Sequence, residues 1–177
     1  GLVGSEMCIR DSMVTALELA RHGVESVVLT SELQLTQGSR AICFTRRSME
    51  ILQQVGVADR MTEGGLPWRF GNSYYRGQRV FRMEAPHDPD DRFFPIINVQ
   101  QQFLEEYLHD ACKASPLIDF RWGNKVNKVE QKDGFAVLEI DTPEGIYKLE
   151  SQWVVAADGG RSAIRTAMHL EMEGASY

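Results

Sequence analysis

The sequence predicts a mixed α/β domain in which helices alternate with buried strands and a small antiparallel β-meander is inserted. A period-3.6 apolar pattern over residues 13–22 ends at Gly23, and the short β-branched run 26–30 follows at once. This is the order of helix and strand in a βαβ unit. Between residues 119 and 152 the pattern changes to period two with turn residues between the runs, which is typical of consecutive antiparallel strands.

Composition places the chain among ordinary globular proteins. Its 177 residues are 43% hydrophobic and 25% charged, which is enough apolar content to bury a core. The net charge of -6 arises without a block of basic residues, so nucleic acid is not an expected partner. The sequence has neither a membrane-length apolar run nor a signal peptide, and it predicts a cytoplasmic protein with no membrane partner. The cysteines and histidines lack metal-ligand spacing, so no metal site is expected.

The first twelve residues are set apart from the rest. Back-translation of residues 6–12 gives codons that contain the mosaic-end sequence attached to DNA by transposase-based sequencing libraries. Residues 1–12 are therefore interpreted as non-native, and the native sequence is expected to start near Met13.

Helices, loops and a hairpin are expected after the first strand. A polar loop over 33–39 precedes a helix over 45–55, and a strand over 96–99 leads into a helix over 101–113. Residues between these two helices lack helical periodicity after position 64, and the hairpin expected there pairs 72–75 with 79–83.

The second half of the chain is expected to be rich in strands. Four period-two runs are assigned to the antiparallel meander: 119–122, 125–131, 135–141 and 147–152. Trp153–Ala157 is then a continuous apolar run, the pattern of a strand buried on both faces. It ends in an Asp-Gly turn, after which a helix is expected over 163–168.

Three motifs, taken in this order, resemble a known enzyme family. They are Gly38-Ser39-Arg40-Ala41-Ile42, Gln100-Gln101, and Asp158-Gly159-Gly160-Arg161-Ser162-Ala163-Ile164-Arg165. Together they resemble the class A FAD-dependent aromatic hydroxylases, the para-hydroxybenzoate hydroxylase-like flavin monooxygenases, and within that group the hydroxyphenylpropionate hydroxylase type. The resemblance covers about residues 13–177. It implies an FAD/NAD(P)-binding Rossmann-like three-layer domain that is incomplete at both ends, because the family's first strand and glycine loop would precede Met13 and a later flavin motif would follow Tyr177.

The resemblance assigns cofactor roles to residues in the two earlier motifs. Arg40, with Ala41 beside it, would reach the FAD phosphates, for which a guanidinium offers parallel donors. The alternative is a solvated loop arginine. Gln101 would hold the ribityl chain and phosphates of FAD, because an amide both donates and accepts hydrogen bonds. Gln100 or simple helix capping are the alternatives to this role.

The Asp-Gly motif and two further positions complete the expected cofactor site. Asp158, Gly159 and Arg165 match the segment that serves both FAD and NAD(P)H in the family; the alternative is an ordinary helix N-cap by Asp158 or Ser162. Val126 resembles the position whose backbone contacts adenine. Glu32 is the candidate for the ribose hydroxyls, although the family's acidic position itself is occupied by Thr30; a surface carboxylate is the alternative.

The activity implied by the resemblance is hydroxylation of a small phenolic substrate with FAD as cofactor, NAD(P)H as co-substrate and O2. FAD would lie in one groove against the Arg40 loop, the start of the Gln101 helix and the Asp158 turn. No catalytic base is identified, and a homodimer is the assembly considered. The chain alone is expected to show little hydroxylation and to bind FAD poorly, because the family's glycine loop and its later flavin motif are missing from it. Two alternatives remain: another FAD-dependent oxidoreductase on the same fold, such as a halogenase or reductase, and a non-catalytic nucleotide-binding module.

Overall fold

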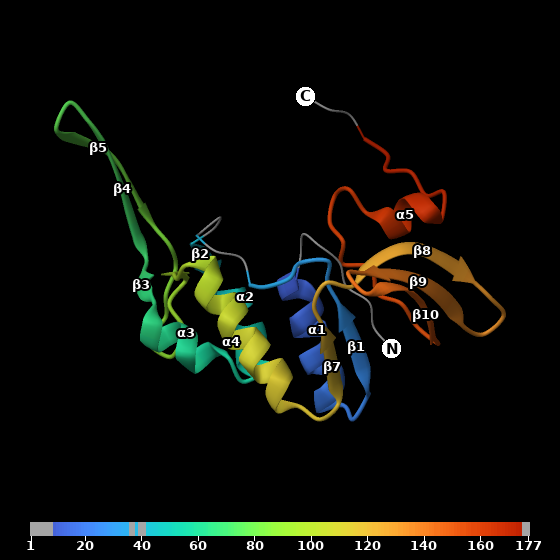
Figure 1. Cartoon of the computed structure of the whole chain (residues 1–177). Coiled ribbons are helices and arrows are strands. Elements are labelled where there is room, and N and C mark those ends of the chain that lie inside the picture. Colours follow the sequence, from blue (N-terminus) through green and yellow to red (C-terminus); the bar gives the residue numbers. More distant parts are fainter. Residues whose placement is uncertain (1–8, 36–37, 39–41, 175–177) are drawn as a thin grey trace. The chain divides into compact units, whose positions relative to one another are not determined.

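The computed structural model describes residues 9–35, 38 and 42–174 (Figure 1). The chain divides into two compact units. The first unit contains the residues up to Leu35 and from Leu108 onward, and the second unit runs from Thr36 to Tyr107. In the part of the chain that the structure describes, no helix has the length and apolar character needed to cross a membrane.

The first unit begins with a helix packed on a parallel strand pair. Helix α1 (Ile9–Arg21) buries Met13 and Leu17 and contacts β1 (Ser26–Leu29). The helix and strand expected here are confirmed. Helix α1 starts inside the segment interpreted as non-native, and the origin of that segment stays a prediction.

Strand β7 (Ile118–Arg121) corrects the expected strand pairing. Its period-two pattern predicts the first strand of the antiparallel meander, but β7 pairs in parallel with β1, with Ser26 opposite Ile118 and Leu29 opposite Arg121. A parallel pair requires a long crossover connection. Here the crossover contains the whole second unit and helix α4 (Gln101–Ala114), a long-range arrangement that local alternation does not reveal.

The meander itself has three antiparallel strands in the order β10-β9-β8. They are β8 (Lys125–Gln131), β9 (Ala136–Thr142) and β10 (Gly145–Ser151). Their inner faces share a core with β1 and with the short helix α5 (Ala163–Ala167). The buried members of that core are Leu29, Val126, Leu138, Ile140 and Ile164. The inserted meander and the mixed α/β class are confirmed, and this core positions the segment that carries the Asp-Gly motif.

The prediction of a strand over Trp153–Ala157 is wrong. These residues have no regular secondary structure, and the Trp153 side chain is 79% exposed. An apolar run becomes a buried strand only when neighbouring strands complete its hydrogen bonds. Among the described residues, no strand pairs with this run, so its composition does not produce the expected structure.

The second unit contains a small antiparallel sheet in the order β2-β6-β3 and helices that begin beside it. Its elements are β2 (Cys43–Thr45), α2 (Arg46–Gln54), α3 (Ala58–Gly64), β3 (Leu66–Trp68), β6 (Ile96–Asn98) and the first half of α4. Thr45 caps α2, because its side-chain oxygen accepts a hydrogen bond from the Ser48 N–H. The expected helices α2 and α4 and strand β6 are confirmed. The sequence analysis missed α3, β2 and β3, which are too short to show a clear period.

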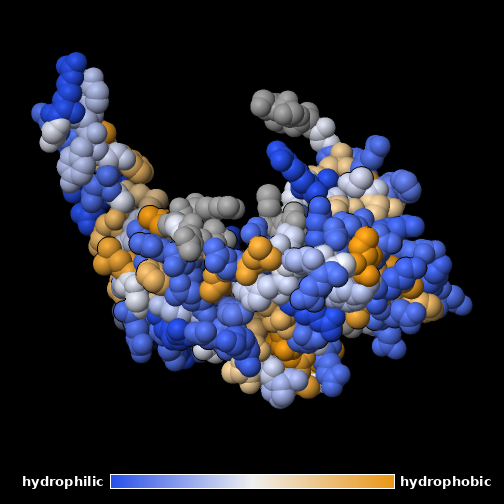
Figure 2. All heavy atoms as spheres, in the orientation of Figure 1, coloured by the Kyte–Doolittle hydropathy of each residue, from blue (hydrophilic) through white to orange (hydrophobic). Residues whose placement is uncertain are grey.

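A two-stranded hairpin extends from the second unit beyond β3 (Figure 1). It pairs β4 (Phe70–Tyr75) with β5 (Gln78–Glu84), as expected but over longer strands. All of β5 is exposed, including Phe81. On the face drawn in Figure 2, apolar residues form separate patches among hydrophilic ones, which is an ordinary surface for a folded domain.

Candidate cofactor site

The Asp158–Arg165 segment forms a turn that is held together by its own side chains. Asp158 Oδ2 accepts a hydrogen bond from the Ile164 N–H at 3.1 Å, and Ser162 Oγ accepts one from the Arg165 N–H at 2.9 Å. Between them the backbone turns through Gly159, whose φ of 71° lies in the left-handed region that favours glycine. The turn is therefore fixed before any ligand binds. Helix capping by Ser162 and Asp158, the alternative to a cofactor role in the sequence analysis, is present in the structure.

Arg165 closes over this turn. Its Nη2 donates a hydrogen bond to the Gly160 carbonyl at 2.9 Å, while its side chain remains partly exposed. A guanidinium carries several N–H donors, so this bond does not exhaust them. The structure thus holds a permanent positive charge beside the two glycines, where a phosphate or carboxylate group would be attracted.

Val126 lies in the same unit and in contact with the same local core. Its side chain is buried with Ile164, the residue whose N–H binds Asp158. The Val126 side chain therefore serves packing. Its proposed backbone contact to adenine stays a prediction.

The end of β1 also lies in the first unit. Thr30 is buried, its carbonyl accepts from the Asn124 N–H at 2.7 Å, and its side-chain oxygen accepts from the Glu32 N–H at 3.2 Å. Through these two hydrogen bonds, Thr30 fixes the conformation of the loop that follows β1. Glu32 is exposed, so its carboxylate rather than the Thr30 hydroxyl is presented to solvent at this strand end. A ribose contact by Glu32 stays a prediction.

Gln101 belongs to the second unit and opens helix α4. Its Nε2 donates a hydrogen bond to Glu105 Oε1 at 2.6 Å, and both side chains are buried. The sequence analysis missed Glu105. The available signal was its spacing of four residues from Gln101, which places both on one helix face, together with its position between the apolar residues Leu104 and Leu108.

Arg40 and Ala41 lie outside the described residues. In the same loop, the Gly38 N–H donates to Gln102 Oε1 at 3.3 Å, so this loop is joined to the first turn of α4. The structure brings Asp158, Arg165 and Val126 together within the first unit. Gln101 is in the second unit, and a groove shared by all these segments stays a prediction.

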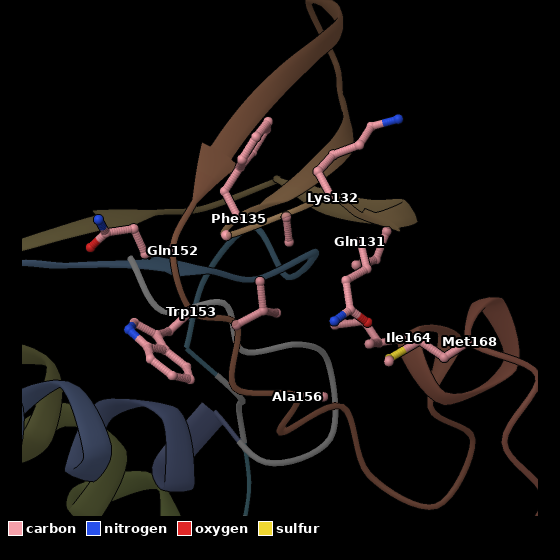
Figure 3. A pocket seen from close by; sticks show the side chains of 12 residues that line it. Gln131, Lys132, Phe135, Gln152, Trp153, Ala156, Ile164 and Met168 are labelled. Atoms are coloured by element: carbon pink, nitrogen blue, oxygen red, sulfur yellow. The ribbon is translucent and has the colours of Figure 1, made fainter.

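A pocket of about 600 Å³ lies beside the Asp-Gly turn. Figure 3 shows Phe135, Trp153, Ile164 and Met168 among the side chains around it. Ile164 links the pocket to the turn, but none of the predicted cofactor residues that the structure describes lines it. Within residues 9–35, 38 and 42–174, no cluster of three or more His, Cys, Asp or Glu residues could hold a metal ion. The residues that line this mainly apolar pocket therefore do not indicate which ligand it would bind.

Comparison with known proteins decides the family. A family profile described as "FAD binding domain" matches residues 12–177. The chain belongs to the FAD-binding domain family. FAD is therefore the cofactor of this family, and the expected cofactor is confirmed. The turn and the start of α4 are the candidate segments for binding it.

Relatives of this FAD-binding domain include monooxygenases. It is 29% identical to the FAD-dependent monooxygenase apdD of Emericella nidulans, over 92% of this chain and 29% of the relative. It is also 29% identical to 3-(3-hydroxy-phenyl)propionate/3-hydroxycinnamic acid hydroxylase 2 of Burkholderia vietnamiensis, over 90% of this chain and 29% of the relative. The resemblance to the hydroxyphenylpropionate hydroxylase type is confirmed. The FAD-binding domain spans under a third of the length of these two relatives.

The fold also matches that of a solved monooxygenase. The crystal structure of p-nitrophenol 4-monooxygenase PnpA from Pseudomonas putida DLL-E4 superposes with a TM-score of 0.89 at 24% identity, covering 100% of this chain and 45% of the other. At this identity the likeness establishes the fold alone. The α/β fold class predicted from the sequence is confirmed by it.

Proposed function

We propose that this FAD-binding domain belongs to an FAD-dependent monooxygenase that hydroxylates a small phenolic substrate with NAD(P)H and O2. The observation that carries the proposal is the turn at Asp158–Arg165, preorganised by three internal hydrogen bonds, in a chain of the FAD-binding family. The names of the relatives supply the substrate class. A halogenase or reductase would share the turn, but the two relatives described above are named as a monooxygenase and a hydroxylase.

The residues of the turn fit a phosphorylated cofactor. Gly159 has no side chain to obstruct a close approach of backbone N–H groups, and its φ of 71° would strain any other residue. Arg165 places a positive charge there. On the second unit, Gln101 offers an amide of fixed orientation, which fits a hydroxyl-bearing chain such as the ribityl group.

In the proposed enzyme, FAD held at this site would supply the redox chemistry: two electrons from NAD(P)H would reduce O2, with one oxygen atom entering the aromatic ring and the other leaving as water. The residues of this domain contribute position rather than acid or base chemistry. Asp158 already accepts the Ile164 N–H and is 6% exposed. It therefore acts as a positioning residue that fixes the turn, and Arg165 compensates negative charge on the cofactor.

FAD binding is tested first, by fluorescence titration of the whole enzyme and of a matched pair of its arginine variants. Arg165→Ala should weaken FAD binding about tenfold, the scale expected for one charge-assisted hydrogen bond. Arg161→Ala is the control, because Arg161 is exposed in the same turn and is not assigned to the cofactor. Equal losses in the two variants, or no saturable binding by the wild type, would contradict the proposal.

Turnover separates the hydroxylase from its alternatives. The whole enzyme should oxidise NAD(P)H faster when phenols are added and should incorporate one atom of isotopically labelled O2 into the ring. Incorporation of halide would indicate a halogenase, and absence of bound flavin would indicate a non-catalytic module. The chain of 177 residues by itself should show little hydroxylation; substrate-dependent turnover by it would contradict that expectation.

The proposal extends to a homodimer located in the cytoplasm. The proposed location is supported by a composition typical of ordinary globular domains. The molar mass of the purified enzyme, measured by light scattering, tests the assembly, and a monomeric mass would remove that part of the proposal.

A further inference from the structure

Helix α4 contains an unusual buried polar pair at its start. Glu105 is 1% exposed and Gln101 is 9% exposed, and the two side chains are joined by a 2.6 Å hydrogen bond from Nε2 to Oε1. One helical turn separates them, so the bond needs no distortion of the helix. The flanking residues Leu104 and Leu108 are buried apolar side chains. A carboxylate thus occupies a position on the buried face of the helix, where the apolar periodicity of α4 predicts an apolar residue.

This pair is costly to the folded state. The second carboxylate oxygen, Glu105 Oε2, is buried and has no hydrogen-bond partner among the described residues. A buried carboxylate that is only partly satisfied destabilises the fold, and an apolar side chain of similar size is commonly neutral or stabilising in its place. A contribution to stability therefore does not explain why a glutamate occupies position 105. A role in holding the Gln101 side chain does explain it.

We propose that Glu105 is a positioning residue that orients the Gln101 amide toward the hydroxyl groups of the flavin's ribityl chain. The inference rests on the proposed function and assigns one subsite within it. A carboxylate only accepts hydrogen bonds, so it selects the nitrogen end of the Gln101 amide. The carbonyl Oε1 of Gln101 is then directed away from Glu105 as an acceptor. An acceptor requires a donating partner, which a hydroxyl group provides and a fully ionised phosphate does not.

A second pair on the same helix provides a matched control. Gln102 Nε2 donates to Glu106 Oε1 at 3.0 Å, with the same spacing of four residues but in a partly exposed position. The Glu106 carboxylate is not assigned to the cofactor. Changes at Glu105 and Glu106 alter the same kind of bond at adjacent positions in the sequence, so a general effect on helix α4 should appear in both.

The test combines FAD affinity, ADP affinity and thermal stability, all measured on the whole enzyme. Glu105→Leu should weaken FAD binding about five- to tenfold, the effect of losing one oriented hydrogen bond. Its melting temperature without FAD should not fall, and its affinity for ADP, which lacks a ribityl chain, should not change. Glu105→Gln retains an acceptor for Gln101 and should bind FAD nearly as wild type does. Glu106→Leu should leave FAD affinity unchanged.

A double variant and a spectroscopic measurement complete the test. Gln101→Leu combined with Glu105→Leu should bind FAD no more weakly than either single variant, because both remove the same interaction. Proton exchange of the Gln101 side-chain amide, followed by NMR without FAD, should be slow in the wild type and fast in Glu105→Leu.

The outcomes separate this inference from the proposed function. Saturable FAD binding that Glu105→Leu leaves intact would overturn the positioning role alone. Parallel losses of FAD affinity, ADP affinity and melting temperature would show that Glu105 is structural and would overturn it as well. A wild-type whole enzyme that binds no FAD would overturn the proposed function together with the subsite assigned here.

Discussion

Cys43 and Cys112 occupy opposite environments that their sequence neighbours do not reveal. Cys112 is fully buried in α4, and burial raises the pKa of its thiol to about 12. Cys43 is exposed on β2, where its sulfur lies 3.1 Å from Asn98 Oδ1. The thiolate is the reactive form of cysteine, so only Cys43 of these two is expected to react in the folded protein.

Thiol labelling checks this expectation in a Cys8→Ser background. At pH 8 Cys43 should react at least about a hundredfold faster than Cys112, because the raised pKa and the burial both limit the Cys112 thiolate. Cys112 should react only when the protein unfolds. Equal rates in the native state would show that α4 opens readily at Cys112.

His109 gives the first unit a dependence on pH. Its ring packs edge-on against Phe120 and Trp122, at centroid distances of 5.1 and 5.3 Å. Burial, and secondarily the charge of Lys113, lower the pKa of His109 below its usual 6.5, while Asp110 opposes the shift. Protonation is therefore disfavoured in the folded state. The unfolded chain takes up the proton first as the pH falls below 6.5, so folding stability decreases there.

The free energy of unfolding measured in urea should show this effect. Between pH 7.5 and pH 5 it should fall more steeply for the wild type than for His109→Gln, which has no titrating ring. Above pH 7 the slopes of the two proteins should agree, because His109 is neutral in both states. A steeper slope for the variant would mean that the pKa of His109 is raised rather than lowered.

Gly65 shows how an element boundary depends on close packing. It ends α3 with φ of -108°, a conformation open to any residue, so backbone strain does not require glycine there. An added Cβ would lie 2.6 Å from Met61 O, from Ile97 Cδ1 and from Val99 Cγ2. The close approach of α3 to β6 therefore leaves no room for even a methyl group.

Gly65→Ala should consequently destabilise the second unit. The expected loss is about 1–3 kcal/mol, the usual cost of overpacking a core, measured as a lower urea midpoint. Gly160→Ala is the control, since a Cβ there meets nothing within 4 Å and its φ is not in the left-handed region. A Gly65→Ala protein as stable as the control would show that α3 can shift away from β6.

The elements that the sequence predicted are those with strong local signals. Helices α1, α2 and α4 have apolar faces of sufficient length, and α2 also has Thr45 as its cap. The missed elements have no such signal. Helix α3 and strands β2 and β3 are short, and they exist because they pack on β6 and on neighbouring helices. Their conformation is set by contacts distant in sequence.

At the scale of the whole molecule, the candidate site also has parts that local sequence signals predict and parts that depend on contacts distant in sequence. The Asp158 turn could be predicted because a glycine with positive φ and two capping side chains within eight residues define it locally. The spacing of Glu105 from Gln101 was visible in the sequence, but the burial of its carboxylate was not, because only the packing of the unit shows it. The relation of Arg40, Gln101 and Asp158 to one cofactor likewise depends on contacts that no local pattern contains.

The sequence by itself determined the α/β class, the longer helices, the meander and the Asp-Gly turn, since periodicity, capping and glycine conformation act over a few residues. Only the tertiary structure decided that β7 pairs with β1 rather than with the meander, and that Trp153–Ala157 forms no strand. Strand pairing is the physical reason. A strand's hydrogen-bond partners come from segments far away along the chain, and its own side chains record which faces are buried but not which neighbour is present.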